Sequence, residues 1–103
     1  MTPSYVTLRK RSDFDRVFRD GRRIRTGGIT VIRCPRSEAE ARVGFVVSRR
    51  LGDAVERNRI KRRLREAARR VAWQEGCDYV VLGSAQVGAA SFPELIGWLA
   101  AAA

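Results

Sequence analysis

The middle of the chain has apolar residues at helical spacing. When successive residues are turned by about 100°, five of them share one arc: Ile60, Leu64, Ala67, Ala68 and Val71. Asp53, followed three residues later by Glu56, has the spacing of a capping box, which marks a helix start. The pattern predicts one helix from about residue 53 to Trp73, before Gly76, with its apolar stripe on the core.

Three other segments have the pattern of β-strands. Residues 29–34 alternate between two faces and stop at Pro35. Residues 42–48 hold consecutive apolar residues, which suggests burial on both faces. Residues 77–82, closed by Gly83, form the last strand. A strand, the central helix and a strand make a βαβ unit, for which the general rule predicts a right-handed crossover.

The N-terminal part predicts an arm and a short helix. We expect residues 1–11 to be extended, with Leu8 as their apolar anchor. Ser12, with Asp15 at the capping-box position, predicts the start of a helix that ends at Gly21.

Aromatic residues fall in two groups with different expected roles. Phe14, Val17 and Phe18 share one face of the first helix, where the two rings suit a core or base stacking equally well. Trp73 and Trp98 are expected to pack in the interior.

The C-terminal part predicts a loop followed by a helix. Residues 84–90 have no periodic pattern and are expected to be a loop. Ser91 with Glu94 is a second capping box, so residues 91–103 predict a C-terminal helix. Its packing residues are Leu95, Ile96 and Leu99.

Length and composition limit the possible classes of protein. With 103 residues, 45% hydrophobic and 31% charged, residues 1–103 suit one globular domain. No apolar run is long enough to span a membrane, and the N-terminus lacks a signal core. Cys34 and Cys77 are far apart and suit small buried residues in a reducing compartment. We therefore expect a soluble, cytoplasmic protein.

Charge is concentrated on the central helix. Ten of residues 49–70 are Arg or Lys and three are acidic, a net +7 of the chain's formal +10. Nineteen of the chain's 21 basic residues are Arg, whose planar guanidinium binds phosphate through two parallel hydrogen bonds. An i,i+4 ladder on the helix contains no acid, although like charges repel at this spacing: Arg57, Lys61, Arg65 and Arg69. A merely solvated face usually mixes charges, so the pattern favours nucleic-acid binding.

The sequence offers no catalytic side chains of its own. It has no histidine, and its eleven carboxylates are too scattered for the convergent cluster of a two-metal nuclease. No serine has a plausible activating base beside it. We therefore expect no catalytic residue and no bound metal, in a protein that holds RNA while another agent cuts.

The basic segment also carries a family resemblance. Residues 57–62 (RNRIKR), preceded by residues 47–55 (VSRRLGDAV), resemble the signature of the protein subunit of bacterial ribonuclease P. The similarity spans about residues 8–83. It implies an α+β domain of order αβββαβα, with a sheet of about four strands whose first strand lies near residues 22–26. It also implies a left-handed βαβ crossover, against the general rule, and we follow the resemblance.

The resemblance implies a function and roles for individual residues. In the family a catalytic RNA subunit, using Mg²⁺, cleaves precursor tRNA to leave the mature 5′ end, and the protein assists without an obligate protein partner. The residues implied to bind the catalytic RNA are Arg49, Arg50, Arg57, Asn58, Arg59 and Arg62. Those implied to bind the 5′ leader of precursor tRNA are Phe14, Phe18, Ile32, Val46, Lys61 and Arg65. The family often has an aromatic ring at the position of Ile32, so one stacking platform is missing here.

Three other functions would also account for the basic charge, but they fit the sequence less well. A structural RNA-binding protein of ribosomal type would not account for the ordered signature. A DNA-binding regulator is disfavoured because strands flank the basic helix and no heptad repeat follows it. A helix on a membrane surface would insert weakly, because its apolar arc is alanine-rich.

Overall fold

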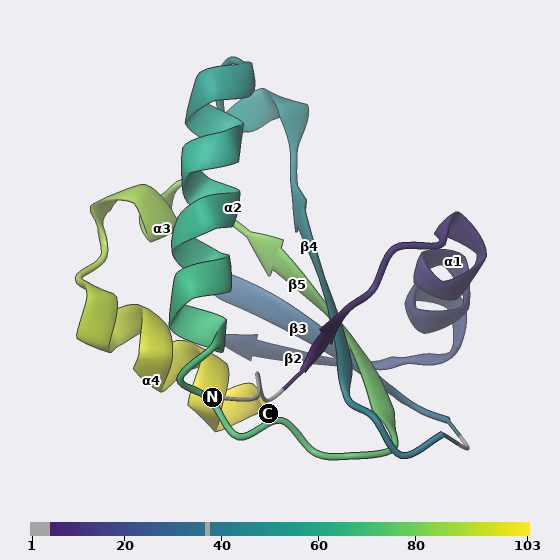
Figure 1. The fold of residues 1–103 in the computed structure, drawn as a ribbon. Helices are drawn as coiled ribbons and strands as arrows, with labels where there is room; N and C mark the ends of the chain where they lie inside the picture. Colours follow the sequence, from purple (N-terminus) through teal and green to yellow (C-terminus); the bar gives the residue numbers. More distant parts are fainter. Residues whose placement is uncertain (1–4, 37) are drawn as a thin grey trace.

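The computed structural model describes residues 5–36 and 38–103, and it confirms the α+β class. Figure 1 shows its elements. In chain order they are β1 (Val6–Thr7), α1 (Arg11–Asp20), β2 (Arg22–Thr26), β3 (Ile29–Pro35), β4 (Arg42–Val47), the 3-10 turn η1 (Arg49–Leu51), α2 (Ala54–Ala68), β5 (Cys77–Gly83), α3 (Gln86–Ala89) and α4 (Phe92–Ala102).

One mixed sheet of five strands runs through the molecule in the order β1-β4-β5-β3-β2. The four expected strands are present, and β1 of the arm adds a fifth by pairing with Arg42 and Val43 of β4. The pairs β1–β4 and β4–β5 are parallel, whereas β5–β3 and β3–β2 are antiparallel. The strand order alone does not separate a left-handed from a right-handed β4–α2–β5 connection, so the left hand stays a prediction.

The helices divide between the two faces of the sheet. α2, α3 and α4 lie on one face and α1 lies alone on the other (Figure 1). The larger core, on the face with three helices, joins sheet residues such as Val43 and Tyr79 to Leu64 of α2 and Leu99 of α4. It includes Trp73, whose indole nitrogen donates to the Ala68 carbonyl at 3.0 Å. Trp98 of α4 packs on this core and against Gly27 at the β2–β3 turn, so both tryptophans pack as expected.

A smaller core lies beneath α1. Its buried residues are Leu8, Val17, Ile32, Cys34 and Val80, and Phe14, Val46 and Leu82 pack against it. Leu8 anchors the arm as expected, and both cysteines are buried thiols. On the apolar face of α1 only Val17 is completely buried, whereas Phe18 remains 36% exposed. α1 therefore packs on the sheet through a narrow apolar face.

Three element boundaries differ from the sequence-based expectation. α1 begins at Arg11 with Lys10 as N-cap, not at Ser12, and no side chain caps it. α2 ends at Ala68 instead of near Trp73, because the chain turns back there and the Trp73 indole binds the Ala68 carbonyl. The expected loop 84–90 contains the single turn α3.

The other two predicted caps are confirmed. Asp53 accepts from the Glu56 backbone N–H at 2.9 Å, and Ser91 and Glu94 bond reciprocally. These hydrogen bonds satisfy backbone donors that a helix start leaves without partners.

Candidate nucleic-acid interface

Helix α2 presents its basic residues on three surfaces around the buried stripe. Lys61 and Arg65 lie on one flank, near the edge of β4. Arg63 lies on the opposite flank, where its guanidinium donates to the carbonyls of Val87 (2.6 Å), Gly88 (3.2 Å) and Ala90 (2.7 Å). Arg59 and Arg62 are exposed and, by helical spacing, point away from the sheet. Arg63 is therefore a structural residue.

The remaining cations of α2 have few acidic partners. Among the residues that the structure describes, the ion pair found in this group joins Arg69, the C-cap of α2, to Glu66 at 3.9 Å. Arg57 donates to the Gly52 carbonyl at 3.0 Å. No ion pair within residues 5–36 and 38–103 involves the other four: Arg59, Lys61, Arg62 and Arg65. Their charge is available to an anionic partner.

The segment before α2 adds to this basic surface. Arg49 and Arg50 are exposed in η1, where the Ser48 hydroxyl accepts from the Arg50 N–H at 3.2 Å. Gly52 has φ of 131°, a left-handed conformation that favours glycine, and it turns the chain into α2. The residues expected to contact the catalytic RNA therefore gather on η1 and the exposed surface of α2.

A pocket of about 210 Å³ opens at the edge of β4. We call it the Phe14 pocket; its lining residues are Thr7, Leu8, Phe14, Phe45, Lys61 and Arg65. Three of the six residues expected to bind the leader thus come together, one from α1 and two from α2. The pocket lies beyond the end of β1, which covers only two residues of β4.

Gly44 of β4 makes room for the Phe14 ring. A Cβ atom at Gly44 would overlap the ring's edge and would lie 3.2 Å from the Leu8 side chain. The ring therefore lies directly on the backbone of β4, half-buried, with part of its surface left for a partner. Sequence reasoning did not identify Gly44, although a glycine inside an apolar strand often marks a close approach.

The other three expected leader residues lie elsewhere. Phe18 is 36% exposed and carries the Arg23 guanidinium 5.9 Å from its ring centre. Val46 is half-buried on the face of the sheet that carries α1. Ile32 is completely buried beneath α1, so it offers a partner no surface and supports the helix from below.

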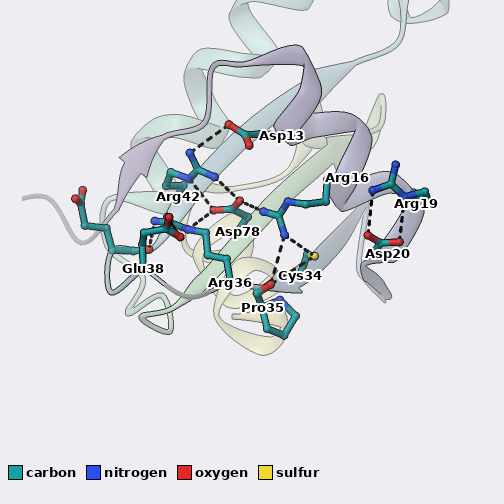
Figure 2. Close-up of polar contacts among 11 residues, drawn as sticks. Asp13, Arg16, Arg19, Asp20, Cys34, Pro35, Arg36, Glu38, Arg42 and Asp78 are labelled. Atoms are coloured by element: carbon teal, nitrogen blue, oxygen red, sulfur yellow. Dashed lines mark hydrogen bonds and ion pairs between the residues drawn. The ribbon is translucent and has the colours of Figure 1, made fainter.

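Sequence reasoning also missed an ion-pair cluster around Asp78 of β5 (Figure 2). Asp78 is completely buried. Arg42 donates to its two oxygens at 2.8 and 2.6 Å, Arg36 Nε lies 2.8 Å from Oδ1, and Arg16 of α1 also donates to it. Arg42 reaches Asp13 of α1 as well, at 3.2 Å. We call these five residues the Asp78 cluster.

The cluster follows from the cost of burying a charge. A carboxylate inside an apolar strand is stable only with cationic partners, so the lone acid in CDYVVL was a usable signal. The hydrogen bonds and charge of Asp78 raise the pKa of Arg42 above its already high ordinary value. The cluster fastens α1, through Asp13 and Arg16, to β4 and β5.

Two features are absent from the described part of the chain, a cluster of metal-binding side chains and a membrane-spanning helix. No three His, Cys, Asp or Glu side chains within residues 5–36 and 38–103 lie close enough together to hold a metal ion. Within the same residues, no helix is both long and apolar enough to cross a membrane.

Comparison with known proteins identifies the family. The family model described as Ribonuclease P matches residues 2–102. The ribonuclease P protein component of Gluconacetobacter diazotrophicus is 38% identical over 87% of this chain and 81% of the relative, and that of Acidothermus cellulolyticus is 43% identical over 92% and 82%. The solved structure of the RNase P protein from Thermotoga maritima superposes with a TM-score of 0.77 at 29% identity, covering 90% of each chain. The chain belongs to the ribonuclease P protein family.

Proposed function

We propose that this chain is the protein cofactor of ribonuclease P, and that α2 serves two RNA partners at once. Its outward surface binds the catalytic RNA, and its flank at the Phe14 pocket binds the 5′ leader of precursor tRNA. The observation that carries this proposal is the division of α2 into two basic surfaces. On the outer surface Arg59 and Arg62 form no ion pair with any described residue, and the flank with Lys61 and Arg65 lies beside the Phe14 ring. A ribosomal type of protein is not favoured, because the family match covers nearly the whole chain.

Contact with the catalytic RNA uses the exposed surface of η1 and α2. Arg59 and Arg62 are the central residues, because both are exposed and neither has an acidic partner among the described residues. A guanidinium without such a partner can bind a phosphate bidentately. The supporting contacts are Arg49, Arg50, Arg57 and Asn58.

Contact with the leader uses the Phe14 pocket. One base stacks on the Phe14 ring, and the neighbouring phosphates meet Lys61 and Arg65 on the facing flank of α2. Stacking tolerates any base, which suits a leader whose sequence varies between precursors. Phe18 and Val46 extend the contact along the same face of the sheet, and Ile32 supports α1 beneath them.

Magnesium belongs with the RNA subunit in this proposal. Within residues 5–36 and 38–103 no three potential metal-binding side chains lie close together, and the buried Asp78 is already surrounded by three guanidiniums. When bound to RNA, Mg²⁺ polarises the phosphate and activates water. The protein's own residues hold and orient the two RNAs. We place this activity in the cytoplasm.

The decisive experiment replaces Phe14 by Leu, which keeps much of the volume and removes the ring. In the assembled holoenzyme, we expect precursor tRNA to bind more weakly by roughly 1–3 kcal/mol, with mature tRNA unchanged. Phe18→Leu should have a smaller effect, because the Arg23 guanidinium already occupies a position near its ring. The measurement is the ratio of precursor to mature affinity, beside the melting temperature of each variant.

The same series separates a leader site from a core role. A volume-conserving swap in a core usually costs less than about 1.5 kcal/mol of stability and would leave the affinity ratio unchanged. If the melting temperature falls while discrimination survives both substitutions, Phe14 belongs to the core and the leader site lies elsewhere.

A further inference from the structure

Strand β4 has a neighbour on both sides for only part of its length. β5 pairs with the whole strand, from Arg42 to Val47, whereas β1 pairs only with Arg42 and Val43. The arm then leaves the sheet toward α1 (Figure 1). Among residues 5–36 and 38–103, no strand pairs with the rest of this edge, residues 44–47. We call this part of β4 the open edge.

The hydrogen bonds of the arm show which main-chain groups of β4 point to this edge. The Val6 N–H donates to the Ala41 carbonyl at 2.8 Å. The Leu8 N–H donates to the Val43 carbonyl at 3.0 Å. Because main-chain groups alternate between the two edges of a strand, the odd-numbered residues of β4 point to the arm and the even-numbered ones to β5. The N–H and the carbonyl of Phe45 therefore point to the open edge.

The arm supplies no partner for these two groups of Phe45. Within residues 5–36 and 38–103, its last main-chain hydrogen bond to β4 is the one from Leu8 to Val43. Phe45 is half-buried, and half-buried main-chain groups need a hydrogen-bond partner, either water or a ligand. The open edge therefore presents one main-chain donor and one acceptor side by side.

This donor and acceptor lie at the Phe14 pocket, whose lining includes Phe45. The two phenylalanines reach the pocket from opposite faces of the sheet. Phe14 lies on Gly44 beneath α1, whereas the Phe45 side chain packs on the larger core. The pocket is therefore at the edge of the sheet, with Lys61 and Arg65 on its α2 side.

We propose that the main chain of Phe45 binds the hydrogen-bonding edge of the base that stacks on Phe14. This inference rests on the proposed function. The Phe45 N–H donates to an acceptor of the base, and its carbonyl accepts from the neighbouring donor. Each of the four RNA bases carries such an adjacent donor and acceptor, so the contact fixes the position of a base without selecting one. The stacked base is thereby held on its face and on its edge.

A peptide strand is a less suitable occupant of the open edge. An unpaired strand edge can add a strand from another chain. Here only Phe45 and Val47 direct main-chain groups to the edge before β4 ends and η1 begins. Two residues offer few hydrogen bonds for strand addition, and the cations of Lys61 and Arg65 suit RNA phosphates.

The simpler explanation is that water alone satisfies the Phe45 main chain, as it does at many strand edges. In that case the Phe45 amide hydrogen would exchange with solvent at the same rate whether or not a leader is bound. A base on the open edge would slow this exchange only when the leader is present. The two explanations therefore differ in one measurable rate.

Residue-resolved amide hydrogen exchange in the assembled holoenzyme tests the contact. When about nine-tenths of the holoenzyme is bound to precursor tRNA, the Phe45 amide should exchange about tenfold more slowly than in the mature tRNA complex, because exchange then proceeds from the unbound fraction. Gly44 and Val46 are the matched controls. Their N–H groups point to β5, so they should exchange equally in the two complexes.

A modified leader separates a hydrogen bond from simple shielding. Adenosine is replaced, one leader position at a time, by purine riboside, which keeps the ring system and lacks the amino donor. We expect one position at which the replacement weakens precursor binding on the order of fivefold, the loss of one hydrogen bond. This effect should largely disappear in Phe14→Leu, because the base is no longer held against the edge. It should persist in Phe18→Leu, since Phe18 does not line the pocket.

The outcomes separate this inference from the proposed function. Equal exchange of the Phe45 amide in the precursor and mature complexes overturns the inference, as does a leader in which no position responds to purine riboside. Slower exchange with the catalytic RNA alone also overturns it, because that RNA would then occupy the open edge. In these cases, lost precursor discrimination in Phe14→Leu leaves the proposed function standing. Discrimination that survives Phe14→Leu overturns the proposed function and this inference together.

Discussion

The Asp78 cluster and the outer surface of α2 use the same side chain in opposite ways. In the cluster three arginines surround one buried carboxylate, and their donors are directed into the protein (Figure 2). On α2, Arg59 and Arg62 are exposed and meet no acid among the described residues. Only part of the chain's positive charge, formally +10, is therefore available to bind a polyanion. Some guanidiniums stabilise the fold, whereas others are exposed to a partner.

Removing the buried carboxylate of Asp78 should have the largest effect. We expect Asp78→Asn to lower the free energy of unfolding by about 3–5 kcal/mol, since it removes the buried carboxylate that three guanidiniums share. Urea denaturation measures the loss. Asp20→Asn is the control, because Asp20 meets Arg19 on an exposed surface, where solvent screens the pair and its loss should change stability little. Equal losses in the two variants would contradict the structural role of the cluster.

Within α2, substitution of Arg63 and substitution of the two outward arginines should change different properties, namely stability and RNA affinity. Arg59→Ala and Arg62→Ala should each cost roughly 1.5–3 kcal/mol of affinity for the catalytic RNA, as for a charge-assisted hydrogen bond. Each should flatten the dependence of log affinity on log salt by about one unit at most. Titrations at several salt concentrations provide both numbers. Wild-type affinity and slope in both variants would show that RNA binds another surface.

Arg63→Ala is the matched control on the same helix. Its guanidinium satisfies three backbone carbonyls, so its loss should lower stability by about 1–3 kcal/mol and leave the salt slope unchanged. A changed slope at unchanged melting temperature would move Arg63 into the RNA-binding group.

A subtler comparison is between two members of the Asp78 cluster. Arg16 comes from α1, whereas Arg36 follows β3, and each substitution to Gln leaves Asp78 with two guanidiniums. Because Arg16 fastens α1, we expect Arg16→Gln to reduce precursor discrimination by less than the roughly 1–3 kcal/mol of a lost stacked base. Arg36→Gln should lower only the melting temperature. Identical discrimination in the two variants would mean that α1 keeps its position without Arg16.

The smallest expected effect concerns Glu94, whose carboxylate accepts a hydrogen bond from a backbone N–H and not from an arginine. The Ser91 backbone N–H, and then its hydroxyl, lower the pKa of Glu94 below its ordinary value of 4.5. The folded pKa is the lower one, so this stabilisation is present above about pH 4.5 and is lost as pH falls through the folded pKa. Melting temperatures of Glu94→Gln and wild type, measured from pH 7 to 3, should therefore converge at acidic pH. A constant difference would contradict the linkage.

The local part of this structure could be predicted from the sequence. Asp53 and Ser91 are confirmed as caps, and the helical spacing correctly separates the buried stripe of α2 from its basic surface. The features that were missed depend on residues far apart in the chain. Asp78 meets Arg16 across 62 positions, and the pairing of β1 with β4 leaves no periodic signal because it covers two residues. Local patterns contain neither kind of contact.

The central place of β5 in the sheet has a consequence for how the chain is made. β5 is the strand between β3 and β4, yet it is the last strand that the ribosome delivers. Until residues 77–83 emerge, β3 lacks the strand that joins it to β4, and the arginines at positions 16, 36 and 42 lack the buried carboxylate that they share. Long-range pairing of this kind forms late and slowly. We therefore expect the sheet to form only after β5, which lies between β3 and β4, has been synthesised.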